Sequence, residues 1–378
     1  ETAHFRIRYL NKDEVLATYA QPVLEQAYQR IAAELRFLPA ERGEKIVVEI
    51  YPDVRGLADA TGLTVKEIEA SGTIAVCKYH RLMITSPLAT ADGYDWADTL
   101  AHEFTHLVIS KKSKNTVPIW LHEGIAKFYE SKWRGKLGEA LSAHSESLLA
   151  EAVQKNKFIT FDAMHPSMAK LPTQKDAALA FAEVFSVIEY LVSTSGTESI
   201  AKLLDTLASQ VELNLALKKT YGMDLHELER AWKKYLSKRP FRIGPGAKAK
   251  VLRLVEQEQA SGQDKPLEEI ADKATHDYAR LGELLELRGQ TQAAMLEYEK
   301  AFARANVRYV TLVYRLARAY MASGKQAAAL PILEQALQAH SSEGDLHLLA
   351  GRIGLERKDY ALAQAHFENV RLQNPYNP

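Results

Sequence analysis

Residues 98–106 read DTLAHEFTH, and residues 118–130 read PIWLHEGIAKFYE. In the first segment His102 and His106 are four positions apart, so a helix would carry both imidazoles on one face, one turn from each other. Glu103 follows His102 directly and would lie about 100° around that helix, close enough to reach a metal-bound water without ligating the ion. The apolar positions between them are typical of a buried helix, which would hold the imidazoles in place. This segment therefore predicts a metal-binding helix.

The second segment supplies a third ligand for the same ion. Glu123 lies 17 positions after His106, which leaves room for the helix end, a polar loop and the start of a second helix. Pro118 suits the first turn of that second helix, where an N–H has no partner to lose. Two imidazoles and one carboxylate, with a fourth position open for water, are a catalytic arrangement of zinc. Together the segments predict a zinc site of His102, His106 and Glu123.

Three other side chains in these segments could also take part. His122 competes with Glu123 for the place of third ligand, although it would point about 100° away from Glu123 on a helix. Glu130 is either solvated or an acceptor for an imidazole N–H. Asp98 is either such an acceptor or an acidic residue that interacts favourably with its helix N-terminus. These alternatives stay open on the sequence alone.

The two segments resemble a known class of peptidases. His-Glu-x-x-His followed by Trp-Leu-x-Glu-Gly-x-Ala is similar to the gluzincins, and within them to the peptidase MA-like group, over residues 3–236. The resemblance implies a zinc metallopeptidase, of the endopeptidase kind, in which His102, His106 and Glu123 hold Zn²⁺. It also implies that Glu103 activates the zinc-bound water as a general base and passes the proton to the leaving amine.

One part of the gluzincin pattern is missing. Many gluzincins stabilise the oxyanion with a Tyr or His from a later helix. The position that matches this tyrosine in the aminopeptidase branch is Phe181, which has no hydroxyl. His165, Tyr129 and Tyr190 could replace it, and the sequence favours none of them. The alternative hypothesis is therefore a catalytically weak or inactive scaffold protein that acts through its C-terminal repeats.

A second departure concerns the kind of peptidase. The Gly-x-Met-x-Asn motif, with which the aminopeptidase branch holds a substrate N-terminus, is absent from the sequence. Exopeptidase activity of that kind is therefore not expected, and an extended peptide would instead bind along a sheet edge beside the metal.

The fold class predicted for the N-terminal part is an α+β, zincin-like peptidase domain with a small mixed sheet and helices. Residues 5–9 alternate in polarity and residues 46–51 are rich in β-branched side chains, so both ranges predict strands. A helix over 13–37 separates them, and a short helix is expected over about 54–60. Two further strands, 73–77 and 82–85, form a hairpin with a polar connection over 78–81. Residues 95–238 have almost entirely helical periodicity.

The last hundred residues repeat with a period of about 34. Gly282, Ala317 and Gly351 recur at this spacing, and each is followed 16 positions later by a larger residue: Tyr298, Leu333 and Phe367. Gly289, Gly324 and Lys358 fall in the intervening turns. This pattern resembles the tetratricopeptide repeat (TPR), which implies an all-α solenoid that binds a peptide or protein partner.

The predicted domains follow from these patterns. Residues 1–239 form the peptidase domain, 240–274 a linker or helical connection, and 275–378 three TPR-like repeats. Proline and glycine at positions 240–246 mark the boundary between the first two.

Composition limits the remaining possibilities. Lys and Arg together number 48, as do Asp and Glu, and the balanced charge argues against a general nucleic-acid or anionic-membrane binder. A membrane span needs roughly 18 uninterrupted apolar residues, and the sequence contains no such run, so no span is predicted. Cys77 is the only cysteine, so neither an intrachain disulfide nor a thiolate cluster can form. The chain begins at Glu1 without a signal segment, and the resemblance slightly favours an extracytoplasmic location, periplasmic or secreted.

Overall fold

The computed structural model describes residues 1–39, 43–90, 93–135, 141–168, 171–242, 267 and 270–376. The chain divides into two compact units. The first consists of Glu1–Leu141 and Leu148–Phe241, and the second of Ser142–Ser147 and Arg242–Pro378. The predicted linker or helical connection over 240–274 lies largely outside the described residues.

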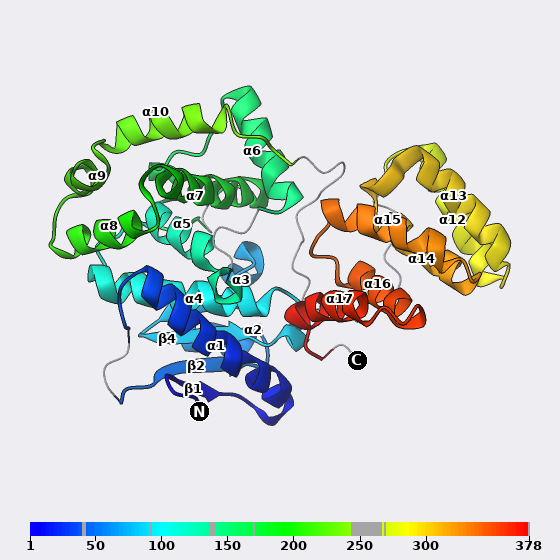
Figure 1. Cartoon of the computed structure of the whole chain (residues 1–378), viewed down its shortest axis with the longest axis horizontal. Helices are drawn as coiled ribbons and strands as arrows, with labels where there is room; N and C mark the ends of the chain where they lie inside the picture. The colour runs from blue at the N-terminus through cyan, green and yellow to red at the C-terminus, as the bar shows by residue number, and fades with distance from the viewer. Residues whose placement is uncertain are drawn as a thin grey trace. The chain divides into compact units, whose positions relative to one another are not determined.

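A mixed sheet of four strands lies in the described part of the first unit (Figure 1). Its order is β1-β2-β4-β3, and the strands are Phe5–Arg8 (β1), Ile46–Tyr51 (β2), Arg81–Thr85 (β4) and Ala75–Lys78 (β3). β1, β2 and β4 are parallel, whereas β3 pairs with β4 antiparallel. β3 is therefore one edge of the sheet, and the predicted small mixed sheet is confirmed.

Two long helices, α1 (Glu14–Glu34) and α4 (Trp96–Ser113), pack on the sheet and on each other. α1 buries nine side chains at helical spacing, which explains why its sequence forms an amphipathic helix. Phe104 of α4, Phe5 of β1 and Tyr28 of α1 form an aromatic cluster with ring centroids 5.8–6.1 Å apart. This cluster ties α4 to both the sheet and α1.

The hairpin between β3 and β4 turns through two residues, Tyr79 and His80. Both have positive φ angles, 53° and 58°, as two-residue turns that match the twist of antiparallel strands require. The sequence pattern predicts this hairpin, with residues 78–81 as its connection. Lys78 and Arg81 instead pair with each other at the end of the ladder.

Two short helices, α2 (Val54–Thr61) and α3 (Val65–Ser71), precede β3. The Asp53 side chain caps α2, and Thr64 begins α3 with a capping box. The sequence pattern predicts α2 but not α3, because a helix of seven residues is too short to show a clear period.

Helices make up most of the rest of the first unit: α5 (Ile119–Tyr129), α6 (Ala143–Lys155) from Leu148 onward, α7 (Gln174–Ser195), α8 (Glu198–Ala208), α9 (Leu213–Tyr221) and α10 (Leu225–Leu236). α5 approaches α7 closely at Gly124. A Cβ atom at Gly124 would lie only 2.8 Å from the carbonyl oxygen of Val184. Glycine at this position therefore sets how α5, and with it Glu123, lies against α7.

α7 is long and apolar enough to cross a membrane, by length and composition alone. Half of its apolar window, Lys175–Ser195, is buried inside the protein, and the helix packs against α5. Glu183 is fully buried in this window and accepts hydrogen bonds from the N–H of Ile159, at 3.1 and 3.2 Å. A core helix of a folded domain has these features. The sequence-based prediction that the chain has no membrane span is not tested by them.

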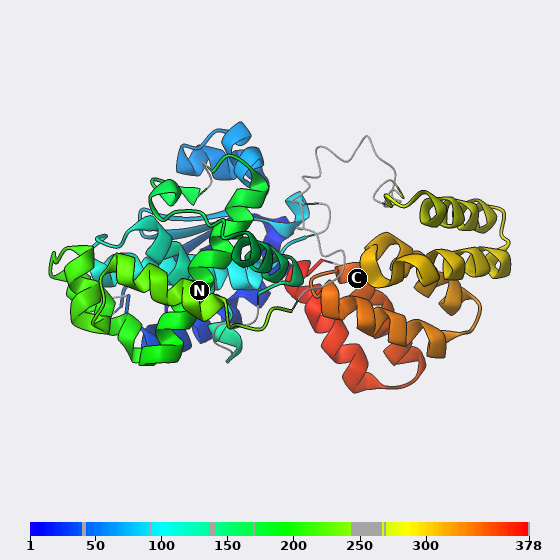
Figure 2. The same ribbon diagram turned by 90° about the horizontal axis from the view of Figure 1, so that it is seen from above.

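The described part of the second unit is helical, with paired helices that Figure 2 shows in yellow, orange and red. The pairs are α12 (Lys273–Leu287) with α13 (Thr291–Ala305), α14 (Val310–Ala322) with α15 (Gln326–Ala339), and α16 (Gly344–Glu356) with α17 (Tyr360–Gln373). The turn residues Gly289, Gly324 and Lys358 all have positive φ, between 58° and 73°. The helical region and its equivalent turns agree with the predicted repeat.

The small residues of the repeat make room for large ones. A Cβ at Gly282 would meet the ring of Tyr298 at 2.6 Å, and a Cβ at Gly351 would meet the ring of Phe367 at 2.5 Å. Ala317 and Leu333 are both fully buried in one core cluster. The small residue and the residue 16 positions later therefore pack together inside each helix pair.

Replacing Gly351 by alanine tests this packing. In an exposed helix the change stabilises by up to about 1 kcal/mol, because glycine is the poorer helix former. Here the added methyl group must displace the Phe367 ring, so we expect the free energy of unfolding to fall by about 1–3 kcal/mol. Urea unfolding measures this, with Arg352→Ala on the exposed face of α16 as the control. A variant as stable as the wild type would contradict the prediction.

Replacing Glu183 by glutamine tests the buried carboxyl group of α7. Burial raises the pKa of Glu183 to about 8, although the Ile159 N–H opposes this, whereas an unfolded chain has about 4.3. The folded protein therefore keeps a proton that the unfolded chain releases, and its stability falls as pH rises between these values, by at most about 1.4 kcal/mol per pH unit.

Glutamine keeps an acceptor for the Ile159 N–H and carries no charge. We expect Glu183→Gln to be more stable than the wild type above about pH 8, with a weaker dependence of stability on pH. Urea unfolding at several pH values measures both, and equal pH slopes for the two proteins would show the prediction to be wrong.

Candidate metal centre

The helices α4 and α5 bring together the three side chains predicted as ligands. The Nε2 atoms of His102 and His106 each lie 3.5 Å from Oε2 of Glu123. The candidate ligand atoms of the three residues all lie within 4.8 Å of one another. The side chains are 12–24% exposed, so the cluster is accessible but largely enclosed. Among the described residues, this is the one such group of three or more His, Cys, Asp or Glu side chains.

The donor atoms and their spacing fit zinc. Zinc binds imidazole nitrogen and carboxylate oxygen at about 2.0–2.2 Å in tetrahedral sites, so two such ligands lie roughly 3.3–3.6 Å apart. Both nitrogen–oxygen separations, at 3.5 Å, fall in this range. Three protein ligands leave a fourth position open, as catalytic zinc sites require.

Glu130 is the outer partner of His102. Its Oε2 lies 3.2 Å from Nδ1 of His102, and its Oε1 accepts a hydrogen bond from Nζ of Lys127 at 2.5 Å. The carboxylate is therefore held between an ammonium group and the imidazole, an arrangement that fixes the orientation of a ligating histidine. Of the two roles left open for Glu130, this geometry favours the acceptor.

Asp98 has different partners. Its carboxylate accepts hydrogen bonds from the indole N–H of Trp133, at 2.7 Å, and from the guanidinium of Arg134. Burial raises the pKa of Asp98 to about 7, against the lowering effect of Arg134. Asp98 lies in the first turn of α4, so the geometry favours its helix-terminal role over contact with an imidazole.

His122 lies beside His106 and outside the ligand group. Its Nδ1 is 2.6 Å from Nδ1 of His106, and its Nε2 is 3.2 Å from Oγ of Ser110. Burial, reinforced by His106, lowers the pKa of His122 to about 3, so the ring is neutral at pH 7. The geometry favours Glu123 over His122 as the third ligand.

Glu103 is buried next to the two imidazoles. Burial raises its pKa; His106 and His102 oppose this rise, and the charge of Glu123 adds to it. The backbone N–H of Cys77, on edge strand β3, donates a hydrogen bond to the Glu103 carboxylate. A carboxylate with a raised pKa, anchored to the sheet edge, suits a general base.

Two of the proposed ligands differ in how they hold a proton: His102 holds one tightly, whereas Glu123 does not. Burial lowers the pKa of His102, but the carboxylates of Glu123 and Glu130 outweigh it and raise the pKa to about 10. Burial raises the pKa of Glu123, whereas His106 and His102 lower it well below its usual value. A proton on His102 therefore competes with a metal ion for the same nitrogen.

None of the candidates for the oxyanion donor forms a hydrogen bond with the ligand side chains in the described part of the chain. Tyr129 is fully buried, and its hydroxyl has no hydrogen-bond partner among the described residues. Tyr190 packs against Tyr235, with ring centroids 5.4 Å apart, and His165 is exposed. Phe181 is partly buried in α7.

Two side chains near the proposed ligands, Ser110 and Lys127, were not predicted from the sequence. Ser110 lies four positions after His106, and Lys127 three positions before Glu130, which are spacings that bring helix side chains together. These spacings can be seen in the sequence, but serine and lysine side chains at such positions are more often solvated, so the contacts were not predicted.

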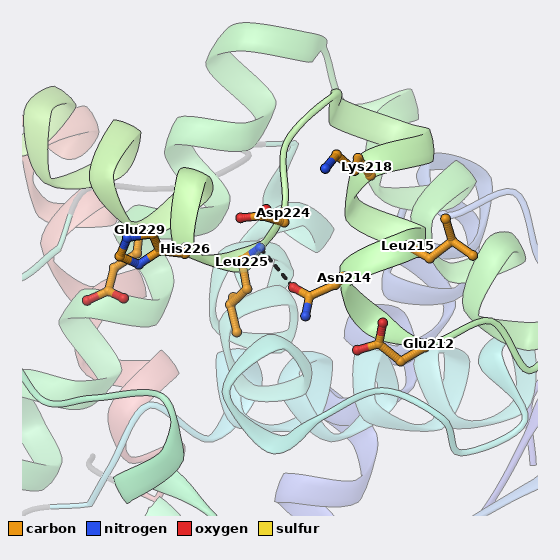
Figure 3. A pocket seen from close by; sticks show the side chains of 8 residues that line it. All are labelled: Glu212, Asn214, Leu215, Lys218, Asp224, Leu225, His226 and Glu229. Carbon is orange, nitrogen blue, oxygen red and sulfur yellow. Dashed lines mark hydrogen bonds between the residues drawn. The ribbon is translucent and has the colours of Figure 1, made fainter.

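A separate pocket of about 600 Å³ lies between α9 and α10 (Figure 3). It is lined by Glu212, Asn214, Leu215, Lys218, Asp224, Leu225, His226 and Glu229. Asp224 caps α10, and Asn214 accepts a hydrogen bond from the N–H of Leu225 at 3.0 Å. None of the predicted ligands lines this pocket, and two of its polar groups already have structural roles.

Comparison with known proteins identifies the class. A family model described as the Peptidase MA superfamily matches residues 15–238, a range that includes α4 and α5. The match covers more than half of the chain, which therefore belongs to the Peptidase MA superfamily. This membership supports a peptidase of a generally metal-dependent class. Neither the curated proteins nor the solved structures gave a match.

Zinc uptake should depend on pH, because the metal must displace the proton of His102. We expect the apparent zinc affinity to rise with pH between about pH 6 and 8, by roughly tenfold per unit for one displaced proton. Competition with a chromophoric chelator at each pH measures the affinity, with a correction for the chelator's own protonation. A pH-independent affinity would contradict the proton competition.

Proposed function

We propose that this chain is a zinc-dependent peptidase in which His102, His106 and Glu123 hold the metal. The observation that carries the proposal is the common 3.5 Å distance from one Glu123 oxygen to the Nε2 atoms of both histidines. Membership of the Peptidase MA superfamily supports the same conclusion independently.

The proposed chemistry divides between the metal and Glu103. Zinc supplies a Lewis acid that polarises a peptide carbonyl and lowers the pKa of water to about 7. The Glu103 carboxylate takes the proton from the attacking water and passes it to the leaving amine. Its raised pKa supports this role, because the proton must be both accepted and released near neutral pH.

The proposed substrate is an extended peptide cleaved internally. β3 is a sheet edge, and the hydrogen bond from Cys77 places this edge beside Glu103. An extended peptide could add to β3 as a further strand, which would bring its backbone next to the base. The missing Gly-x-Met-x-Asn motif supports an endopeptidase over an aminopeptidase.

We also propose that the helix pairs over 275–378 are TPR-like and bind a substrate or protein partner. The tight approach of Gly282 to Tyr298 and of Gly351 to Phe367, and the matching turns, support such repeats. The boundaries of the peptidase domain (1–239) and of the connection (240–274) are part of this proposal.

The alternative is a metallopeptidase-like scaffold with weak or no turnover. Phe181 favours it, because an oxyanion donor removed from a hydrolase typically costs about 2.7–4 kcal/mol in the activation barrier. Glu103 favours the enzyme, because a purely structural metal site has no use for a buried base.

Glu103→Gln separates the two functions. We expect the wild type to bind one zinc per chain and to cleave an unstructured protein such as casein. The variant should keep the zinc and lose about 100-fold or more of the cleavage rate, because glutamine cannot accept the proton. Metal analysis and gel-based cleavage measure both properties, and Glu212→Gln, on the exposed surface, is the matched control.

Two results would count against the enzyme. Stoichiometric zinc without turnover on diverse peptides would favour the scaffold. A metal-free protein whose properties do not change in His102→Ala would remove the metal centre altogether.

A further inference from the structure

His106 and His102 have chemically different outer partners. Nδ1 of His102 faces the Glu130 carboxylate, whereas Nδ1 of His106 faces another imidazole nitrogen, Nδ1 of His122, at 2.6 Å. The His106 and His122 rings lie 4.6 Å apart between centroids, and their planes differ by 21°. The two Nδ1 atoms lie at hydrogen-bonding distance, so an N–H on one ring can donate to the Nδ1 lone pair of the other.

The other side of His122 is also occupied. Its Nε2 lies 3.2 Å from the hydroxyl of Ser110, which is one turn after His106 on α4. Ser110, His122 and His106 thus form a hydrogen-bonded chain that starts on α4, crosses to α5 and returns to α4. Both nitrogens of His122 are used in this chain, so neither is left to bind a metal.

The position of the metal centre determines where each proton lies. Nε2 of His106 faces Glu123, so this nitrogen ligates and the proton of the neutral ring must be on Nδ1. His106 therefore donates to Nδ1 of His122. The proton of His122 must then be on Nε2, from which it is donated to the Ser110 hydroxyl. One tautomer of each ring satisfies the whole chain.

We propose that His122 is a positioning residue that selects the metal-binding tautomer and orientation of His106. The inference rests on the proposed zinc centre and adds to it a residue that is not a ligand. Outer partners of ligating histidines are commonly carboxylates, backbone carbonyls or waters. Here an imidazole, oriented by a serine, has that function, and unlike a carboxylate it fixes His106 without adding negative charge beside the metal.

Two substitutions separate hydrogen bonding from space filling. His122→Phe keeps a ring of similar size but offers no acceptor to His106. His122→Asn keeps both an acceptor for His106 and a donor for Ser110. A residue that only filled space would be replaced better by phenylalanine, whereas a positioning residue would be replaced better by asparagine.

The measurement is zinc affinity, by chelator competition on the folded, full-length protein. We expect His122→Phe to bind zinc 10–100-fold more weakly than the wild type, as is typical for loss of an outer partner. His122→Asn should recover most of the affinity. The visible absorption of the cobalt(II)-loaded proteins should change in the phenylalanine variant and remain near wild type in the asparagine variant. The exposed His226→Phe is the control for loss of a histidine.

Circular dichroism establishes that each variant is folded, and His122→Leu replaces the phenylalanine variant if the latter is not. Phenylalanine or leucine variants with wild-type zinc affinity and cobalt spectrum would overturn the role of His122 and leave the zinc centre intact. A wild type that takes up no zinc would overturn the centre itself, and the inference with it.

Discussion

The ligand group depends on how closely α5 lies against α7. Gly124 follows Glu123, and a side chain there would collide with the carbonyl oxygen of Val184. The helix that carries Glu123 is therefore seated on the backbone of its neighbour, where a small displacement would open the 3.5 Å distances to both imidazoles. Since the candidate centre depends on helix packing rather than on a loop, the proposed ligands are placed rigidly.

α4 is fixed from the opposite side. Its Phe104 packs with Phe5 of β1 and Tyr28 of α1, so the core of the sheet determines where the histidine face points. Two scaffolds therefore meet at the centre: a sheet that carries α4, and a helical layer that carries α5. The Cys77 N–H on Glu103 links the base to the same sheet.

The two histidines of the candidate centre have different hydrogen-bond partners at their Nδ1 atoms. His102 is held by a carboxylate whose charge is balanced by Lys127, and His106 by a neutral imidazole. His122 belongs to α5 and Glu130 is the C-cap residue of that helix, whereas both histidines of the candidate centre belong to α4. The contacts that orient the imidazoles thus also hold the two helices together, which couples the packing of the fold to the geometry of the site.

The sequence was sufficient to predict those features that depend on the period of one helix or on a fixed spacing along the chain. His102, His106 and Glu123 could be grouped from the helical period, and the small and large residues of the C-terminal helices from a period of 34. It could not distinguish the two roles open to Asp98, because that choice depends on where Trp133 and Arg134 lie in space. The choice for Glu130 likewise depends on where His102 and Lys127 lie. The role of His122 could not be predicted either, because its partner Ser110 lies on another helix.

An anomalous scattering map at the zinc absorption edge, from crystals of the zinc-loaded protein, tests the central claim most directly. The account predicts one strong peak bonded to Nε2 of His102, Nε2 of His106 and a carboxylate oxygen of Glu123, at about 2.0–2.2 Å from each. A peak that has His122 in place of Glu123, or that lies away from α4 and α5, would contradict it.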